Sequence, residues 1–225
     1  MSIRSAALAS FVACSGAIAL AAASTLSTAL AQQPAPTPMD LKAPSEFESI
    51  GDRTARSQAL FTELGKVLTH PRCMNCHPAG ASPTQNDDRH LHMPPVFRED
   101  ADAGTIGTTC AGCHSSENFA VSGASTYKSV PGHARWGFAP LSMAWQGRSL
   151  GDICRQLKDK DRNGGRDLAM LQEHIAKDDL VAWGWKPGPG RVPAPGNQET
   201  AGKLAQAWID TGAACPEFAP EIRPQ

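Results

Sequence analysis

The chain has 225 residues, of which 41% are hydrophobic, with 21 basic and 22 acidic side chains and 7 cysteines. With charges so nearly balanced, the chain lacks the excess of basic residues that is typical of nucleic-acid binding. After residue 31, no stretch is apolar for long enough to span a bilayer. The length suits one domain or two small ones.

Residues 1–31 have the pattern of an export signal. Arg4 supplies the positive start, an uncharged run extends from Ala6 to Leu30, and Ala29-Leu30-Ala31 is a small-residue cleavage site. We expect cleavage after Ala31, a periplasmic location and no stable membrane anchor. Two alternatives stay open, lipid attachment through Cys14 and an uncleaved N-terminal anchor.

The composition changes again after the signal. Residues 32–45 are rich in proline and are expected to form a disordered leader. We expect a single domain over 46–216, followed by a C-terminal tail over 217–225.

Four segments of this domain carry apolar residues at helical spacing, and they lie at about 46–69, 149–159, 166–177 and 197–211. Pro71 is expected to end the first helix, and Gly212 to cap the last. The intervening stretches 78–109 and 115–147 hold many breakers and are expected to be loops. Because no stretch alternates with period two, the predicted fold class is mostly α with long loops.

Two C-x-x-C-H motifs follow the first helix, Cys73 to His77 and Cys110 to His114. Two thiols at this spacing can add to the vinyl groups of one haem, and the adjacent histidine then ligates the iron. We therefore predict two covalently attached haem c groups in a haem-centred core. The attachment residues are Cys73, Cys76, Cys110 and Cys113, and the proximal iron ligands are His77 and His114.

Two other interpretations of the paired cysteines fit the sequence less well. A zinc ribbon needs no histidine after each pair, and the 33 residues between the pairs exceed the usual ribbon spacing. A thioredoxin-like pair would be expected inside a βαβ pattern, which the sequence lacks.

The distal iron ligands are harder to predict, because any histidine or methionine that reaches the iron would serve. His92 is the first choice for the first haem, with His90 and Met93 as rivals. Met143 is the first choice for the second haem, with His133 and His174 as rivals. An exposed histidine or a methionine in the core is the alternative for each.

Further residues are candidates for the haem surroundings. The arginines that could pair with haem propionates are Arg89, Arg98, Arg135, Arg148 and Arg191. The tryptophans expected to line the haem pocket and the core are Trp136, Trp145, Trp183, Trp185 and Trp208.

Cys154 and Cys215 remain outside the haem motifs. In an exported chain two such thiols are usually joined, which predicts a disulfide between them. Two buried free thiols are the alternative.

The motifs together resemble a family of exported bacterial dihaem cytochromes, often labelled as an isoquinoline 1-oxidoreductase subunit. The resemblance covers about residues 55–216, and it rests on C-M-N-C-H-P, C-A-G-C-H, N-G-G-R, W-G-W-K-P-G-P-G-R and A-W-I-D-T-G-A-A-C-P. It implies a cytochrome c-like dihaem domain and a redox partner, such as a molybdenum hydroxylase. The chain lacks the iron–sulfur motif and the length of a molybdenum enzyme, so hydroxylase activity is not implied.

The predicted function is electron transfer between a dehydrogenase and a downstream acceptor, after haem attachment by the cytochrome c maturation machinery. No catalytic residue is predicted. The alternative is a small dihaem peroxidase-like enzyme with one open haem site. The 37-residue offset between Cys73 and Cys110 leaves little room for two complete haem domains.

Overall fold

The structure is a computed structural model that describes residues 39–97, 109–120 and 129–217. The predicted export signal, with its Cys14 alternative, and Arg98 lie outside these residues. The fold is mostly helical, which confirms the predicted class. The helical elements are η1 (Pro44–Phe47), α1 (Arg53–Leu68), α2 (Pro71–Met74), η2 (Cys110–Gly112), η3 (Leu141–Met143), α3 (Leu150–Lys158), α4 (Leu168–Lys177), α5 (Asp179–Ala182), η4 (Trp183–Trp185) and α6 (Gln198–Asp210).

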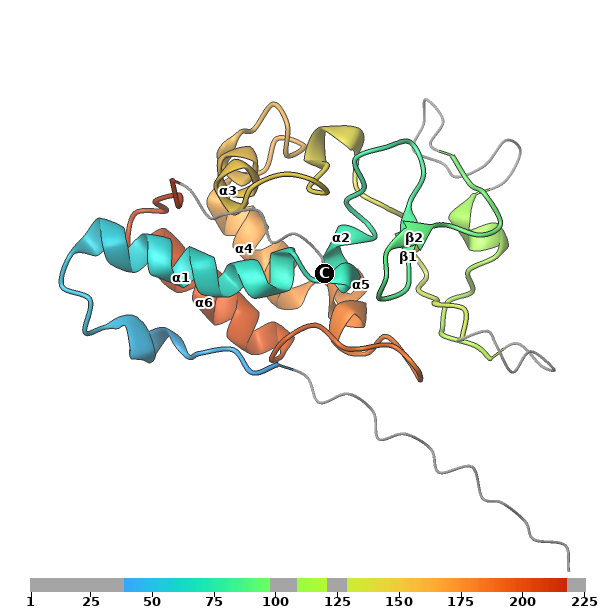
Figure 1. Ribbon diagram of the computed structural model, residues 1–225, viewed down its shortest axis with the longest axis horizontal. Helices are drawn as coiled ribbons and strands as arrows, with labels where there is room; N and C mark the ends of the chain where they lie inside the picture. The colour runs from blue at the N-terminus through green and yellow to red at the C-terminus, as the bar shows by residue number, and fades with distance from the viewer. Residues whose placement is uncertain (1–38, 98–108, 121–128, 218–225) are drawn as a thin grey trace, which may run out of the picture. The chain divides into compact units, whose positions relative to one another are not determined.

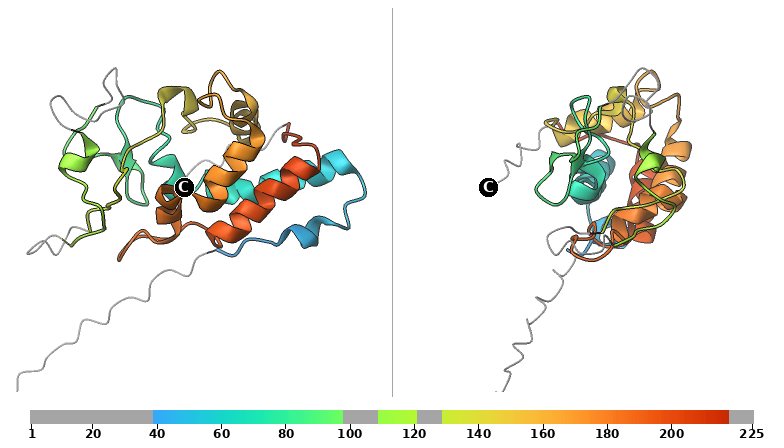
Figure 2. Two further views of the ribbon diagram at one scale, coloured as in Figure 1. Left: turned by 180° about the vertical axis from the view of Figure 1, so that it is seen from behind. Right: turned by 90° about the vertical axis from the view of Figure 1, so that its right-hand side faces the viewer.

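The longer helices α1, α3, α4 and α6 gather at one end of the described part, as Figure 1 and the left view of Figure 2 show. The apolar face predicted for the first helix is buried, and Phe61 of α1 packs on Trp208 of α6 with ring centres 4.8 Å apart. Gly202 lets α6 approach α4 closely, since a Cβ atom there would lie 2.4 Å from the Ala176 Cβ. This apolar helical packing forms the core.

Side-chain caps set the helix starts. Asp52, Ser149, Asp167 and Asn197 each accept a hydrogen bond from the backbone N–H three residues later. The first helix, predicted from about residue 46, therefore starts at Arg53, and η1 is a separate turn.

Pro71 also marks the start of a helix. It occupies the first position of α2, where its missing N–H removes no hydrogen bond, so it opens a new helical turn as well as ending the first helix.

A short hairpin lies within the predicted loop 78–109. Strand β1 (Thr84–Gln85) pairs antiparallel with β2 (His90–Leu91), with Thr84 opposite Leu91. Strands of two residues are too short to show a periodic sequence pattern. The hairpin lies at the other end of the described part from the four longer helices (Figure 1).

Part of the expected leader contacts the domain. The Met39 carbonyl accepts a hydrogen bond from the Gly196 N–H at 2.8 Å, and the Lys42 N–H donates to Glu63 at 2.9 Å. Leu41 packs against the core. The packed region therefore begins before residue 46, because these tertiary contacts hold a proline-rich segment whose composition alone predicts disorder.

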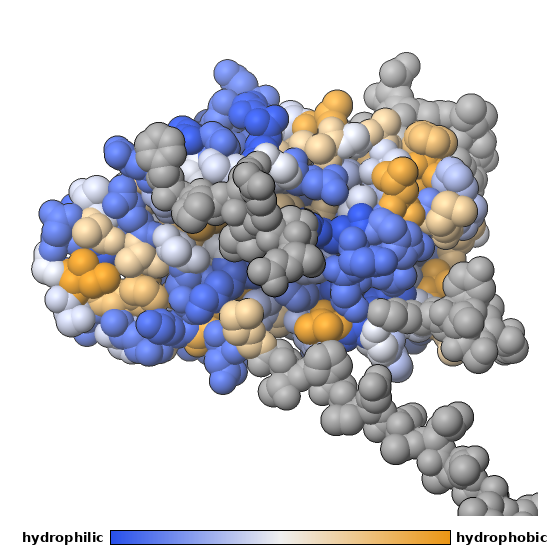
Figure 3. Space-filling view, viewed as in Figure 1, coloured by the Kyte–Doolittle hydropathy of each residue, from blue (hydrophilic) through white to orange (hydrophobic). Residues whose placement is uncertain are grey.

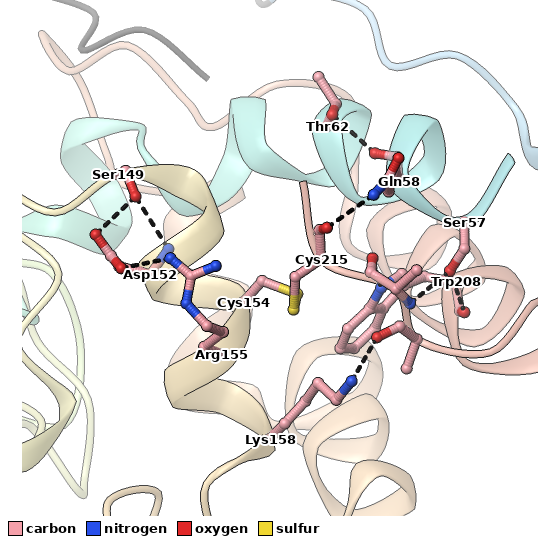
Figure 4. The surroundings of a disulfide bond; sticks show 12 residues. Ser57, Gln58, Thr62, Ser149, Asp152, Cys154, Arg155, Lys158, Trp208 and Cys215 are labelled. Atoms are coloured by element: carbon pink, nitrogen blue, oxygen red, sulfur yellow. Dashed lines mark hydrogen bonds and ion pairs between the residues drawn. A yellow bond between two sulfur atoms is a disulfide. The ribbon is translucent and has the colours of Figure 1, made fainter. Parts of the chain in front are cut away.

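The predicted disulfide between Cys154 and Cys215 is confirmed, with Cα atoms 5.6 Å apart (Figure 4). It ties α3 to the segment that follows α6. Around it, the Lys158 ammonium donates to the Ala213 carbonyl at 2.8 Å, and the Gln58 amide donates to the Cys215 carbonyl at 3.0 Å. Within the residues described, the structure contains no helix with the length and apolar character needed to cross a membrane.

Candidate functional site

The helical turn of α2 carries the first cysteine motif directly from the core. Its N-cap is His70, whose Nδ1 accepts the Arg72 N–H at 3.2 Å. Burial, with a smaller contribution from Arg72, lowers the pKa of His70 to about 4. The ring is therefore neutral at physiological pH and can accept this hydrogen bond.

The turn continues through the motif itself. The N–H groups of Cys76 and His77 donate to the Cys73 carbonyl at 3.1 and 3.2 Å. Residues at positions i, i+3 and i+4 of a helical turn lie on the same face. The C-x-x-C-H spacing thus presents two thiols and one imidazole to one side.

The second motif repeats this arrangement on η2. The N–H groups of Cys113 and His114 donate to the Cys110 carbonyl at 3.2 and 2.9 Å. The four motif cysteines are thiols, in contrast to the disulfide-bonded pair. Each motif is therefore a separate helical turn with the same three groups on one face.

Both motif histidines are oriented through the same ring nitrogen. His77 Nδ1 lies 2.7 Å from the Met143 carbonyl, and His114 Nδ1 lies 2.6 Å from the Pro131 carbonyl. A carbonyl only accepts, so Nδ1 carries the proton in each ring. Nε2 is then the nitrogen suited to a metal, as is common for metal-bound histidines.

Each motif histidine also stacks on a tryptophan. The His77 and Trp145 ring centres are 3.5 Å apart with planes 5° from parallel, and those of His114 and Trp136 are 5.0 Å apart at 19°. Trp136 in turn meets Trp183 edge to face at 4.9 Å. These contacts restrict rotation of both imidazoles.

Residues of both motifs contribute to the lining of one cavity of about 540 Å³. Cys76 of the first motif lines it, together with Cys110, Cys113 and His114 of the second. Its volume lies within the range of about 300–1,000 Å³ typical of cofactor and ligand sites. The remaining walls are largely apolar and include Pro83, Pro94, Pro95, Val96, Val130, Trp136 and Phe138.

The thiols of the first motif are held in their neutral form. Burial raises the pKa of Cys73 to about 12 and that of Cys76 to about 11, although the nearby Arg72 opposes both shifts. Among the described residues, no three His, Cys, Asp or Glu side chains form a metal-binding group. Four of the six motif cysteines and histidines line the cavity instead, and Cys73 and His77 are not part of its lining.

One wall of the cavity holds two arginines. Arg72 is 3% exposed, forms an ion pair with Asp87, and lies with its guanidinium 6.0 Å from the Trp183 ring centre. Arg191 donates to the Ser129 hydroxyl at 2.8 Å. Burial lowers the pKa of both arginines, and the proximity of Arg72 lowers that of Arg191 further. Two cations therefore share this wall, close to the carboxylate of Asp87.

The Nε atom of Arg72 is buried and has no hydrogen-bond partner. A buried guanidinium nitrogen without an acceptor costs free energy, so the wall is suited to an additional anionic group. A covalently attached haem matches these features. Its vinyl groups need paired thiols, its iron needs imidazole nitrogens, its ring needs apolar walls, and its propionates need cationic partners.

The structure places the first choices for the distal ligands at the opposite motifs. His92, predicted for the first haem, lies beside His114 of the second motif, with ring centres 5.9 Å apart. Met143, predicted for the second haem, lies beside His77 of the first motif, where its carbonyl accepts the imidazole hydrogen bond. The Met143 side chain is buried in the core.

The rival histidines have other partners. His133 is 3.3 Å from Asp179 through Nε2 and accepts a backbone N–H through Nδ1. His90 is bonded to Asp88 and Gln85 through its two ring nitrogens. His174, on α4, is 3.0 Å from Asp178. The remaining rival, Met93, lines the cavity and is exposed.

The predicted arginines differ in whether they line the cavity. Arg191 lines it, whereas Arg135 is paired with Asp178 at 2.9 Å and Arg148 donates to the Ala144 carbonyl at 3.1 Å. Arg89 lies in the turn between β1 and β2 and is not part of the lining. Arg72 was not among the predicted arginines, although its position directly before Cys73 was a signal in the sequence.

The predicted tryptophans divide between the cavity and the core. Trp136 and Trp183 line the cavity, Trp145 stacks on His77, and Trp208 belongs to the core. Trp185 packs against the core and donates to the Pro195 carbonyl at 2.9 Å.

No protein-family model, curated protein or solved structure matches the chain.

Proposed function

We propose that this protein is a periplasmic dihaem c-type cytochrome that carries electrons between a dehydrogenase and a downstream acceptor. The observation that carries the proposal is the pair of C-x-x-C-H turns, which both contribute lining residues to one largely apolar cavity. Each turn offers two thiols and an oriented imidazole on one face. The domain would thus be a cytochrome c-like dihaem domain with the haems beside the helical core.

The bound haem iron would supply a one-electron redox centre. The chain's own residues would hold it through thioether bonds, ligate it through His77 and His114, and exclude water with the apolar walls. Arg72 and Arg191 would balance the propionate charge. Because both motifs line one cavity, electrons would pass between the haems within a single domain.

Two observations support the proposed cellular location and the proposed redox partner. The disulfide between Cys154 and Cys215 is typical of an oxidising compartment, which supports a periplasmic location. Leu91 of the hairpin is exposed, as are Met93 and Phe97 just after it. Hydrophobic groups are visible on the surface of the face that Figure 3 shows. Leu91, Met93 and Phe97 provide a surface for a redox partner, and the sequence resemblance favours a molybdenum hydroxylase in that role.

A carrier and an enzyme differ in their resting spectra. We expect both haems of the purified, oxidised protein to be six-coordinate and low-spin, to be reduced and reoxidised reversibly, and to leave cyanide and peroxide unbound. The measurement is absorption and electron paramagnetic resonance spectroscopy before and after each addition. A persistent high-spin haem with peroxide turnover would instead support the small dihaem peroxidase-like enzyme.

A further inference from the structure

We propose that His92 is the distal ligand of the iron whose proximal ligand is His114, so that the second haem is held between two histidines. The inference rests on the proposed function, since it assigns a ligand within the same dihaem site. It differs from the assignment by sequence, which gave His92 to the first haem and Met143 to the second.

The separation of the two rings supports this pairing. The ring centres of His92 and His114 are 5.9 Å apart, and their planes are inclined by 55°. Two imidazoles on opposite sides of one metal ion, with metal–nitrogen bonds of about 2 Å, have ring centres roughly 6 Å apart. Their planes can take any angle about the common axis, so the observed inclination is compatible with shared ligation.

The rings of His92 and His114 also have the same tautomer. His92 Nδ1 lies 2.8 Å from the Pro94 carbonyl, as His114 Nδ1 lies 2.6 Å from the Pro131 carbonyl. Both Nδ1 atoms are therefore donors, which leaves Nε2 as the ligand nitrogen in each ring. Within the described ranges, no hydrogen bond occupies Nε2 of either His92 or His114.

His92 is positioned by the first motif. Its N–H donates to the Pro83 carbonyl at 3.1 Å, next to the hairpin. The hairpin is attached to Asn75, which lies between Cys73 and Cys76. The Thr84 hydroxyl donates to the Asn75 side-chain oxygen at 2.8 Å, and the Asn75 amide donates to the Asn86 carbonyl at 2.9 Å. The first haem-binding turn thus holds the segment that would complete the second site.

The rival ligands fit this position less well. His133 uses both ring nitrogens in hydrogen bonds, and the backbone of Met143 is bonded to His77 of the other motif. His174 is paired with Asp178 on α4. Among these candidates, His92 is the one whose ring contacts the ring of His114.

The test is the spin state of the His92→Ala protein. We expect it to retain two covalent haems, but one of the two should become high-spin when oxidised, so that half of the iron changes its spectrum. Added imidazole should restore the low-spin state, and the altered haem should bind carbon monoxide when reduced. The control is His90→Ala on the same hairpin, which should keep both haems low-spin.

A second variant covers the case in which His92→Ala does not accumulate. His92→Met retains a possible ligand, and we expect one haem to gain the near-infrared band of methionine-to-iron charge transfer and a higher reduction potential. His90→Met should show neither change. The inference is overturned if both haems of His92→Ala stay low-spin, if His133→Ala alone produces the high-spin haem, or if His92→Met shows no new band. A wild-type haem count other than two would instead overturn the proposed function.

Discussion

Replacing Cys110 and Cys113 by serine should halve the covalently bound haem while the helical core stays folded. Cys110 begins η2, a three-residue turn without a buried residue, and Cys113 is its C-cap. Both lie outside the packing of α1, α4 and α6. Loss of the second haem should therefore disorder mainly the cavity walls. Haem content per chain and far-ultraviolet circular dichroism measure the two effects separately.

The matched control is the double substitution at the first motif, Cys73→Ser with Cys76→Ser. It should also remove one haem, but with a much larger loss of folded protein, since Cys73 packs against the core and Asn75 anchors the hairpin. Two haems in the Cys110 and Cys113 variant, or complete loss of its helical signal, would contradict this account.

Removing the disulfide with Cys154→Ala and Cys215→Ala should lower the free energy of unfolding by about 4 kcal/mol on the chain-entropy model. The bond joins residues 61 positions apart, and Cys154 is fully buried. Close packing surrounds it, since a Cβ atom on Gly151 would lie 2.3 Å from the Pro216 carbonyl oxygen. Guanidinium unfolding followed by circular dichroism measures the loss.

The haem spectra should not change in this variant, because the disulfide lies away from the cavity lining. Reductant should lower the stability of the wild-type protein to that of the variant, and it should leave the variant unaffected. A loss below about 1 kcal/mol would show that the cross-link contributes little beyond the packing around it.

Local signals predicted the helical part of the fold well. The position of α3, predicted at about 149–159, and the buried face of α1 follow from the helical spacing of apolar residues. The start of α1 was misplaced because apolar residues before Asp52 extend the helical pattern into η1. The hairpin was missed because its register depends on Asn75, about ten residues away in the chain.

In the candidate site, too, the sequence predicted the local features but not those that depend on tertiary contacts. The arrangement of thiols and imidazole within each motif is local, since it depends on one helical turn. Distal ligands are brought in by tertiary contacts, so the spacing between His77 and His92 gave no indication that His92 lies beside His114. Arg72 was missed because its burial against Trp183 and Asp87 also depends on distant segments.

Both C-x-x-C-H turns are proposed to carry covalent haem. The most direct measurement is the haem count per chain, from the pyridine haemochrome spectrum of the purified protein and the mass of the denatured chain. We predict two haems per chain that stay attached after denaturation and extraction with acidified organic solvent. A chain with no haem or one haem, or with haem that is extracted, would contradict the account.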